Sequence, residues 1–320
     1  MDESHGHTNT KPLVSIGIPT YQRVETLRRA IDSALAQSYT NIEVVICDDG
    51  SSDATQVLCR DLSAHDGRVR YLRSPTNLGL VANHNKLFAE MHGQYVMMLC
   101  DDDWLEASYV ERCLAELKAN PDHILVCGAA RYLNEGEFVR DGVAFQLTHP
   151  DPATRIRAYL KGIDENGLLY GLMPRTALIH AAPMRNVLGN DWLLVMAILA
   201  QGKARTVQDT AILRELDGTS ADFDKLTTTL KLPRWQARIP HLVLSWQLFA
   251  EIGWRAPVYR SLSLVARTRL AMMAAWASIR WRSLVWHMTM PTFAMIGRRA
   301  HGGLIWRAYS GLARLLGGNG

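Results

Sequence analysis

Three consecutive aspartates, Asp101 to Asp103, directly follow an apolar run at residues 96–100. Adjacent carboxylates repel one another, so a chain that keeps three of them together usually holds a cation there. On an extended backbone Asp101 and Asp103 point to one side and Asp102 points away. Because hard divalent cations prefer oxygen ligands, the pattern predicts a metal site built on Asp103 and Asp101. A solvated acidic loop is the alternative.

Two more polar segments follow apolar runs that are typical of buried strands. Pro19-Thr20-Tyr21 follow residues 13–18, and Asp48-Asp49 follow residues 42–47. Side chains that follow the strands of a parallel sheet gather at one edge of that sheet. We therefore expect one cleft to collect both segments together with the three aspartates.

Strands and helices are expected to alternate through the first part of the chain. The predicted strands cover residues 13–18, 42–47, 69–72 and 96–100, with helices between them. A spacing of roughly 25 to 30 residues per unit indicates βαβ crossovers and an α/β fold with a parallel sheet. Neither a dinucleotide-binding glycine motif nor a Walker-type loop follows the first strand. A phosphate bound in this cleft would therefore need a metal to screen its charge.

Five segments, in this order and spacing, resemble the GT-A-fold family 2 glycosyltransferases. They are residues 14–23, 46–53, 77–79, 93–96 and 101–103. The resemblance is strong over residues 13–120 and extends to about residue 220. It implies a Rossmann-like, mostly parallel sheet flanked by helices. It also implies an enzyme that binds a nucleotide-diphosphate sugar with Mg²⁺ or Mn²⁺.

The resemblance also suggests a role for each residue of the cleft. By position, Pro19, Thr20 and Tyr21 would contact the nucleoside, and Asp49 would accept a hydrogen bond from the base. Asp101 and Asp102 would reach the ribose and the diphosphate, and Asp103 would bind the metal. The chemistry of these residue types agrees, because a tyrosine ring can stack on a base and a carboxylate can accept a base N–H.

Asp191 begins an apolar helix that is predicted to run to Ala200. An aspartate at this position can simply cap the helix. Relatives in the resembled family carry their general base here, so the resemblance implies that Asp191 takes the proton from an acceptor hydroxyl. One carboxylate suffices for a single displacement with inversion, which we adopt as a hypothesis.

Two family features are missing from this chain. Many relatives carry a metal-binding histidine after the position of Arg214, where this chain has Glu215. An oxygen of Glu215, of Asp217 or of water could bind the metal instead. Metal dependence is therefore expected to be weaker or differently built. The Gln-x-x-Arg-Trp signature of processive synthases is also absent, so we expect one sugar per encounter.

Charge is distributed unevenly along the 320 residues. Residues 1–230 carry a net charge of −8, whereas residues 231–320 carry +12 and hold seven of the nine tryptophans. We expect a disordered segment at 1–12, a catalytic domain at 13–225 and a helical extension at 226–320. No secretory signal opens the sequence, and the five cysteines show no metal or redox spacing, which is typical of a cytoplasmic protein.

Arginine and tryptophan beside aliphatic runs suit an anionic membrane surface. No uncharged run there reaches the ~18 residues of a spanning helix, so residues 231–320 are expected to lie on the inner face of the cell membrane. A helical subdomain that packs on the core is the alternative, and nucleic-acid binding is disfavoured because no such module is present.

The resulting hypothesis is a non-processive glycosyltransferase that acts on a lipid-linked or cell-envelope glycan. Two alternatives remain open. A sugar-phosphate nucleotidyltransferase would use a similar sheet but usually has a glycine-rich loop after the first strand. A non-catalytic binding protein on a degenerate GT-A fold would explain the missing histidine.

Overall fold

The computed structural model describes residues 11–163, 166–215 and 223–278. The segment predicted to be disordered, residues 1–12, lies outside the described residues apart from its last two. Residues 279–320, which include Trp281, Trp286 and Trp306, also lie outside them.

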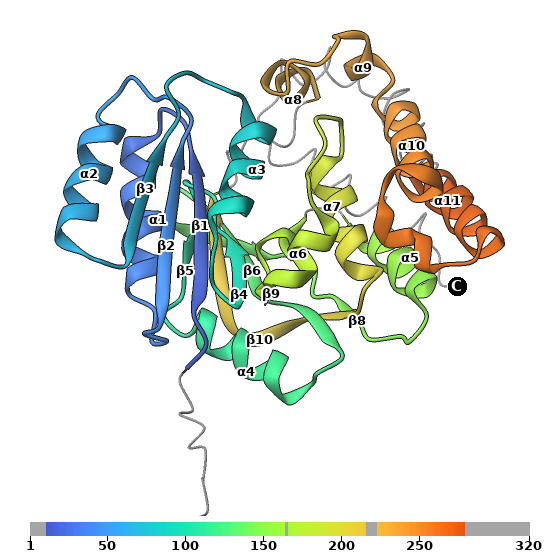
Figure 1. Cartoon of the computed structure of the whole chain (residues 1–320), viewed down its shortest axis with the longest axis horizontal. Helices are drawn as coiled ribbons and strands as arrows, with labels where there is room; N and C mark the ends of the chain where they lie inside the picture. Colours follow the sequence, from blue (N-terminus) through green and yellow to red (C-terminus); the bar gives the residue numbers. More distant parts are fainter. Residues whose placement is uncertain (1–10, 164–165, 216–222, 279–320) are drawn as a thin grey trace, which may run out of the picture. The chain divides into compact units, whose positions relative to one another are not determined.

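The first sheet has the strand order β3-β2-β1-β4-β9 (Figure 1). Its strands are β1 (Val14–Thr20), β2 (Ile42–Asp48), β3 (Val69–Arg73), β4 (Tyr95–Met98) and β9 (Met173–Pro174). The first four pair in parallel, and β9 runs antiparallel to β4. The predicted mixed α/β fold with a parallel sheet is therefore confirmed. Because β1 lies between β2 and β4, the ends of all three strands are neighbours.

Helices cover both faces of this sheet. They are α1 (Val24–Leu35), α2 (Thr55–His65) and α3 (Leu80–Glu90). Val44 and Ile46 share a hydrophobic cluster with residues of α1, whereas Val45 and Cys47 share a cluster with residues of α3. This alternation follows from the two-residue period of a strand whose faces are both buried.

A second sheet contains the strands β5, β10, β6 and β7, with β8 paired to β10. Their bounds are β5 (Trp104–Leu105), β6 (His123–Asn134), β7 (Glu137–Asp141), β8 (Gln146–Leu147) and β10 (Lys203–Glu215), and α4 (Tyr109–Ala119) precedes β6. Leu213 in β10 pairs with Trp104 in β5. This pairing carries the next residue, Arg214, to the segment that follows β4.

Between β8 and β10 the chain forms a helical layer. Its members are α5 (Pro152–Gly162), the 3₁₀ helix η1 (Gly167–Tyr170), α6 (Arg175–Ala181) and α7 (Asn190–Leu199). Every residue of α7 from Leu193 to Leu199 is buried. A helix that is apolar on all sides belongs in a core, and α7 is enclosed in this way.

The C-terminal helices, as we call residues 223–278, contribute to the same core. They are α8 (Phe223–Thr229), α9 (Trp235–Arg238), α10 (Pro240–Ala250), η3 (Glu251–Arg255), η4 (Pro257–Ser261) and α11 (Leu264–Ser278). Leu248, Ile252 and Ala271 are fully buried in the cluster that also contains residues of α7 and β4. Among the described helices, none combines the length and the apolar character that a membrane span requires.

The five cysteines are all free thiols, and only Cys100 is partly exposed. Burial raises the pKa of Cys47 and Cys59 to about 12, so both stay protonated. They behave as small core residues, as the sequence predicted.

Candidate functional site

The acidic turn, residues 101–103, lies beside the end of β1. The hydroxyl of Thr20 donates to Oδ2 of Asp101 at 2.8 Å, and the backbone N–H of Asp49 donates to the carbonyl of Thr20 at 3.0 Å. Thr20 thus joins the end of β2 to the end of β4. The structure brings these three predicted residues together because their strands are neighbours in one sheet.

The turn differs from the extended geometry that the sequence suggested. Strand β4 ends at Met98, and residues 101 and 102 form a turn. The expectation that Asp101 and Asp103 share one side of an extended strand is therefore wrong, because the backbone is no longer extended at that point. Their assignment as metal ligands stays a prediction.

Two arginines, Arg23 and Arg29, lie close to Asp101 and Asp102 and offset their negative charge. A guanidinium nitrogen of Arg23 donates to Oδ2 of Asp102 and lies 3.8 Å from Oδ1 of Asp101. Arg29 donates to the backbone carbonyl of Asp102 at 2.9 Å and stacks over the ring of Trp104. Arg29 also lies 3.7 Å from the carboxylate of Glu215, so the suggested substitute ligand already has a cationic partner.

A third arginine, Arg214, holds the innermost carboxylate. Its Nε donates to Oδ2 of Asp103 at 3.0 Å, and its other nitrogens donate to the hydroxyls of Tyr132 and Tyr170 at 2.8 and 3.2 Å. Both tyrosine rings lie against the guanidinium. Arg214 is therefore a fixed cation between two aromatic rings.

Burial makes the turn costly to ionise. It raises the pKa of Asp103 to about 7 and that of Asp101 to about 6, and the neighbouring carboxylates add to both shifts. Arg214 and Arg23 oppose these shifts without cancelling them. A further cation at this turn would stabilise the ionised carboxylates.

Ligand atoms of Cys100, Asp102 and Asp103 lie within 4.8 Å of one another. Burial and the nearby aspartates raise the pKa of the Cys100 thiol well above its usual range, so sulfur is a poor ligand here. The two carboxylates offer hard oxygen atoms, and Oδ1 of Asp103 is not used by Arg214. The donor set therefore fits a hard divalent cation such as Mg²⁺ or Mn²⁺, with Asp102 in the place that we expected Asp101 to take.

Asp49 holds the loop that precedes α3. Its two oxygens accept the backbone N–H groups of Leu78 and Gly79, each at 2.8 Å. A carboxylate can accept about four hydrogen bonds, so base recognition by Asp49 stays a prediction in which it uses the remaining lone pairs. Tyr21 is 42% exposed at the end of β1, which leaves its ring free to stack on a base.

Asp191 lies in the first turn of α7 and does not cap it. The N-cap residue is Gly189, at φ 74°, which makes no side-chain cap. Nδ2 of Asn166 donates to Oδ2 of Asp191 at 3.0 Å. Burial raises the pKa of Asp191, whereas this hydrogen bond and the charge of Arg214 lower it. A partly desolvated carboxylate near a charged cluster is suited to proton transfer.

His84, in α3, has a structural role within its own helix. Nδ1 of its ring lies 2.8 Å from the carbonyl of Leu80 in the same helix, and burial lowers its pKa. Asp217, the other suggested substitute ligand, lies outside the described residues.

Sequence reasoning missed Arg23, Arg214 and Asn166 as members of the site. One signal was available for Arg214, because it follows the apolar run Ala211-Ile212-Leu213. A charged residue at the end of a buried strand points to a nearby partner, in the same way as the aspartates after residue 100.

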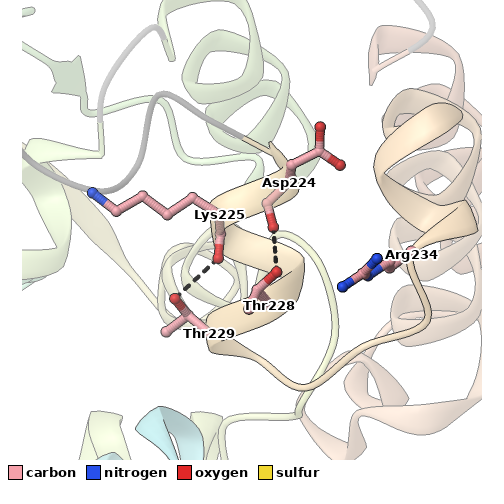
Figure 2. A pocket seen from close by; sticks show the side chains of 5 residues that line it. All are labelled: Asp224, Lys225, Thr228, Thr229 and Arg234. Carbon is pink, nitrogen blue, oxygen red and sulfur yellow. Dashed lines mark hydrogen bonds between the residues drawn. The ribbon is translucent and has the colours of Figure 1, made fainter.

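A pocket beside α8 has none of these residues in its lining. It measures about 560 Å³ and is lined by Asp224, Lys225, Thr228, Thr229 and Arg234. In Figure 2 the amine of Lys225 extends away from Arg234, so the two cations do not converge. The hydroxyls of Thr228 and Thr229 donate to carbonyls of their own helix. We therefore assign this pocket no role in the chemistry.

Comparison with known families gives one match that covers about half of the chain. The family model described as glycosyl transferase family 2 matches residues 15–177. That range contains β1 to β4, the acidic turn, Asn166 and η1. It ends before Asp191 and Arg214.

Several characterised proteins are similar over part of the sequence. The hyaluronan synthase of Pasteurella multocida is 36% identical over 137 residues, which are 42% of this chain and 14% of that protein. The chondroitin synthase of Escherichia coli is 37% identical over 132 residues, 41% of this chain and 19% of that protein. The chain thus matches less than a fifth of the length of these two relatives.

Solved structures share the fold. S. aureus TarS 1-349 in complex with UDP-GlcNAc has a TM-score of 0.61 at 13% identity, covering 85% of this chain and 74% of that chain. The mannosyltransferase PcManGT from Pyrobaculum calidifontis, in complex with GDP-Man and Mn²⁺, has a TM-score of 0.50 at 18% identity, covering 88% of this chain and 84% of that chain.

Proposed function

Since the chain belongs to glycosyl transferase family 2, we propose that it transfers a sugar from a nucleotide-diphosphate sugar to a hydroxyl of a lipid-linked or cell-envelope glycan. The observation that carries this proposal is the meeting of Thr20, Asp49 and Asp101 through hydrogen bonds at the strand ends. Similarity to hyaluronan and chondroitin synthases supports a glycan acceptor.

The nucleoside would bind at the end of β1. Tyr21 offers an exposed ring, and Pro19 and Thr20 line the same strand end. Asp49 would accept a base N–H, and Asp101 and Asp102 would face the ribose and the diphosphate. Arg23 already bridges these last two carboxylates and can turn one N–H toward a phosphate oxygen.

Asp102 and Asp103 are the residues that would hold a divalent cation, with Asp101 as the other predicted ligand. When bound, such a cation offsets the negative charge of the leaving diphosphate. Arg214 keeps a permanent positive charge beside Asp103 and would remain there whether or not a cation is bound. This agrees with the expectation of a differently built metal site.

Asp191 would act as the general base. Its carboxylate would take the proton from the acceptor hydroxyl while the acceptor oxygen attacks the anomeric carbon opposite the diphosphate. The proposal names no second carboxylate as nucleophile, so we expect inversion. Because the signature of processive synthases is absent, we expect a single transfer per encounter.

A donor panel with two aspartate variants tests this function. We expect one UDP- or GDP-sugar, with Mn²⁺, to raise the melting temperature and to be hydrolysed. Asp191→Asn should keep the thermal shift and lose transfer by about 10³-fold, within the range for general bases. Asp209→Asn, a change on an exposed aspartate of β10, should alter neither. Full turnover in Asp191→Asn would exclude the catalytic role.

We also propose that residues 231–320 bind the cytoplasmic face of the cell membrane. Leu242 and Trp246 on α10, and Ile239 at its N-cap, are exposed at a spacing that defines one face, whereas Val243, Leu244 and Leu248 pack inward. Trp254 is 50% exposed and packs edge-on against Trp246 at 5.7 Å. Exposed apolar groups at this density usually mark an interaction surface.

The charge of this region favours anionic lipid. Its only acid, Glu251, is buried and paired with Arg185, whereas Arg234, Arg238 and Arg260 are exposed. We expect the protein to float with vesicles that contain phosphatidylglycerol and not with neutral ones. Equal recovery after truncation at residue 231 would remove the claim.

A further inference from the structure

A chain of hydrogen bonds runs behind Asp191. The hydroxyl of Tyr159, on α5, donates to Oδ1 of Asn166 at 2.8 Å. Nδ2 of Asn166 then donates to Oδ2 of Asp191 at 3.0 Å. The three residues come from three elements, α5, the start of η1 and α7, so tertiary packing fixes their arrangement.

Only one arrangement of protons satisfies this chain when Asp191 is ionised. A carboxylate accepts hydrogen bonds and cannot donate, so the amide NH₂ of Asn166 must face Asp191. The amide oxygen then faces Tyr159, whose hydroxyl must donate. Burial and the charge of Asp191 raise the pKa of Tyr159 well above its usual range, so that hydroxyl keeps its proton.

The same segment also contacts two residues that adjoin the acidic turn, Cys100 and Arg214. Tyr170, at the end of η1, accepts a hydrogen bond from Arg214 at 3.2 Å, and its hydroxyl lies 3.1 Å from Sγ of Cys100. Residues 166–170 therefore connect the groups around Asp103 to Asp191. A short helix fixed at both ends sets the separation of the two sites.

We propose that Asn166, held by Tyr159, is a positioning residue that engages Oδ2 of Asp191 and so orients this carboxylate toward the acceptor hydroxyl. This inference rests on the proposed catalytic role of Asp191. Its physical basis is that a hydrogen bond to a charged acceptor both orients the carboxylate and favours its ionised form.

The inference predicts a pH-dependent defect. Among the residues that the structure describes, the titratable side chains that interact with the charge of Asp191 are Tyr159 and Arg214, and neither titrates near neutral pH. Asn166→Ala removes a contact that lowers the pKa of Asp191, so the acid limb of the kcat profile should move to higher pH. We expect kcat to fall about tenfold on the acid limb, because a hydrogen bond to a charged group is lost. On the alkaline plateau, kcat should fall less than about threefold.

Further variants separate positioning from folding. Tyr159→Phe removes one hydroxyl and should move the limb in the same direction by a smaller amount. Asn166→His retains a donor and should restore part of the loss. Asn120→Ala and Tyr39→Phe, which remove hydrogen bonds far from Asp191, should leave the profile unchanged.

Two results would overturn the inference. One is an equal loss at every pH in Asn166→Ala and Tyr159→Phe, and the other is no loss in either. If Asp191→Asn is inactive while the kcat profiles of Asn166→Ala and Tyr159→Phe keep the pH dependence of wild type, the positioning role of Asn166 is wrong and the catalytic role of Asp191 stands. If Asp191→Asn is active, the catalytic proposal itself fails.

Discussion

The acidic turn and the C-terminal helices place arginine in opposite surroundings. At the turn, Arg214 is enclosed by two tyrosine rings and donates to a buried carboxylate. In the C-terminal helices, Arg238 is exposed, and exposed tryptophans lie on the neighbouring helix. The acidic turn pairs its charges inside the protein, whereas Arg238 is available to an external partner.

The two kinds of arginine should contribute to different properties, the buried one to folding stability and the exposed one to binding. A buried charge that loses its partner is costly, whereas an exposed charge contributes little to folding. We therefore expect substitutions at the turn to change the free energy of unfolding. Substitutions on the exposed face of the C-terminal helices should change binding to a surface.

The largest effect is expected from Arg214→Met. The change leaves Asp103 and two tyrosine hydroxyls without their shared donor, at a cost of about 3–5 kcal/mol in the free energy of unfolding. Urea unfolding at pH 8 measures this cost, because Asp103 is ionised there. Arg238→Met is the matched control and should stay within about 0.5 kcal/mol of wild type. Similar losses in the free energy of unfolding for both variants would show that the two arginines do not differ in their contribution to stability.

The second prediction concerns pH. The pKa of Asp103 is about 7 when folded, against 3.8 for the free side chain, so the folded state binds more protons between these values. The free energy of unfolding should then fall as pH rises through this window, by up to ~1.4 kcal/mol per pH unit, and level off above it. Urea titrations in EDTA test this slope.

Asp103→Asn isolates the contribution of this carboxylate. Asp101, whose pKa is about 6, remains in both proteins, so the difference between the two slopes belongs to Asp103. The variant should show the flatter dependence. Parallel curves for variant and wild type would contradict the burial argument.

The smallest effect belongs to the exposed face. Replacing both Trp246 and Trp254 by serine should weaken binding to anionic vesicles by roughly tenfold, because each ring is half exposed and can bury only part of its area in lipid. Phe138→Ser, at an exposed position of β7, is the matched control. Unchanged flotation of the double variant would point to a different face or to no membrane contact.

The sheet and the meeting of the strand ends could be predicted from the sequence. Strands β1, β2 and β4 are largely apolar, polar residues lie at or just after their ends, and the spacing indicates parallel crossovers. These are local signals, so the approach of Thr20, Asp49 and Asp101 follows from topology alone.

The contacts of Arg214 and Asn166 could not be predicted in this way. Arg214 reaches Asp103, which lies 111 residues earlier in the chain, because β10 pairs antiparallel with β5. Asn166 meets Asp191 through the packing of η1 against α7. The turn after Met98 was also missed, because an apolar run does not reveal where its extended backbone ends.

The sequence predicted only part of the surroundings of α10. The sequence suggested either a membrane surface or packing on the core as alternatives. The structure has one face of α10 packed on the core and the other exposed, so the packing interpretation holds for the first face and membrane binding stays a proposal for the second.

Calorimetric titration of nucleotide-diphosphate sugars tests the central claim most directly. With Mn²⁺ present, wild type should bind one donor, and EDTA or Asp103→Ala should weaken that binding by at least about tenfold, as expected when a cation that screens the diphosphate is lost. A titration that is silent for every donor, or binding that neither EDTA nor Asp103→Ala affects, would contradict the account.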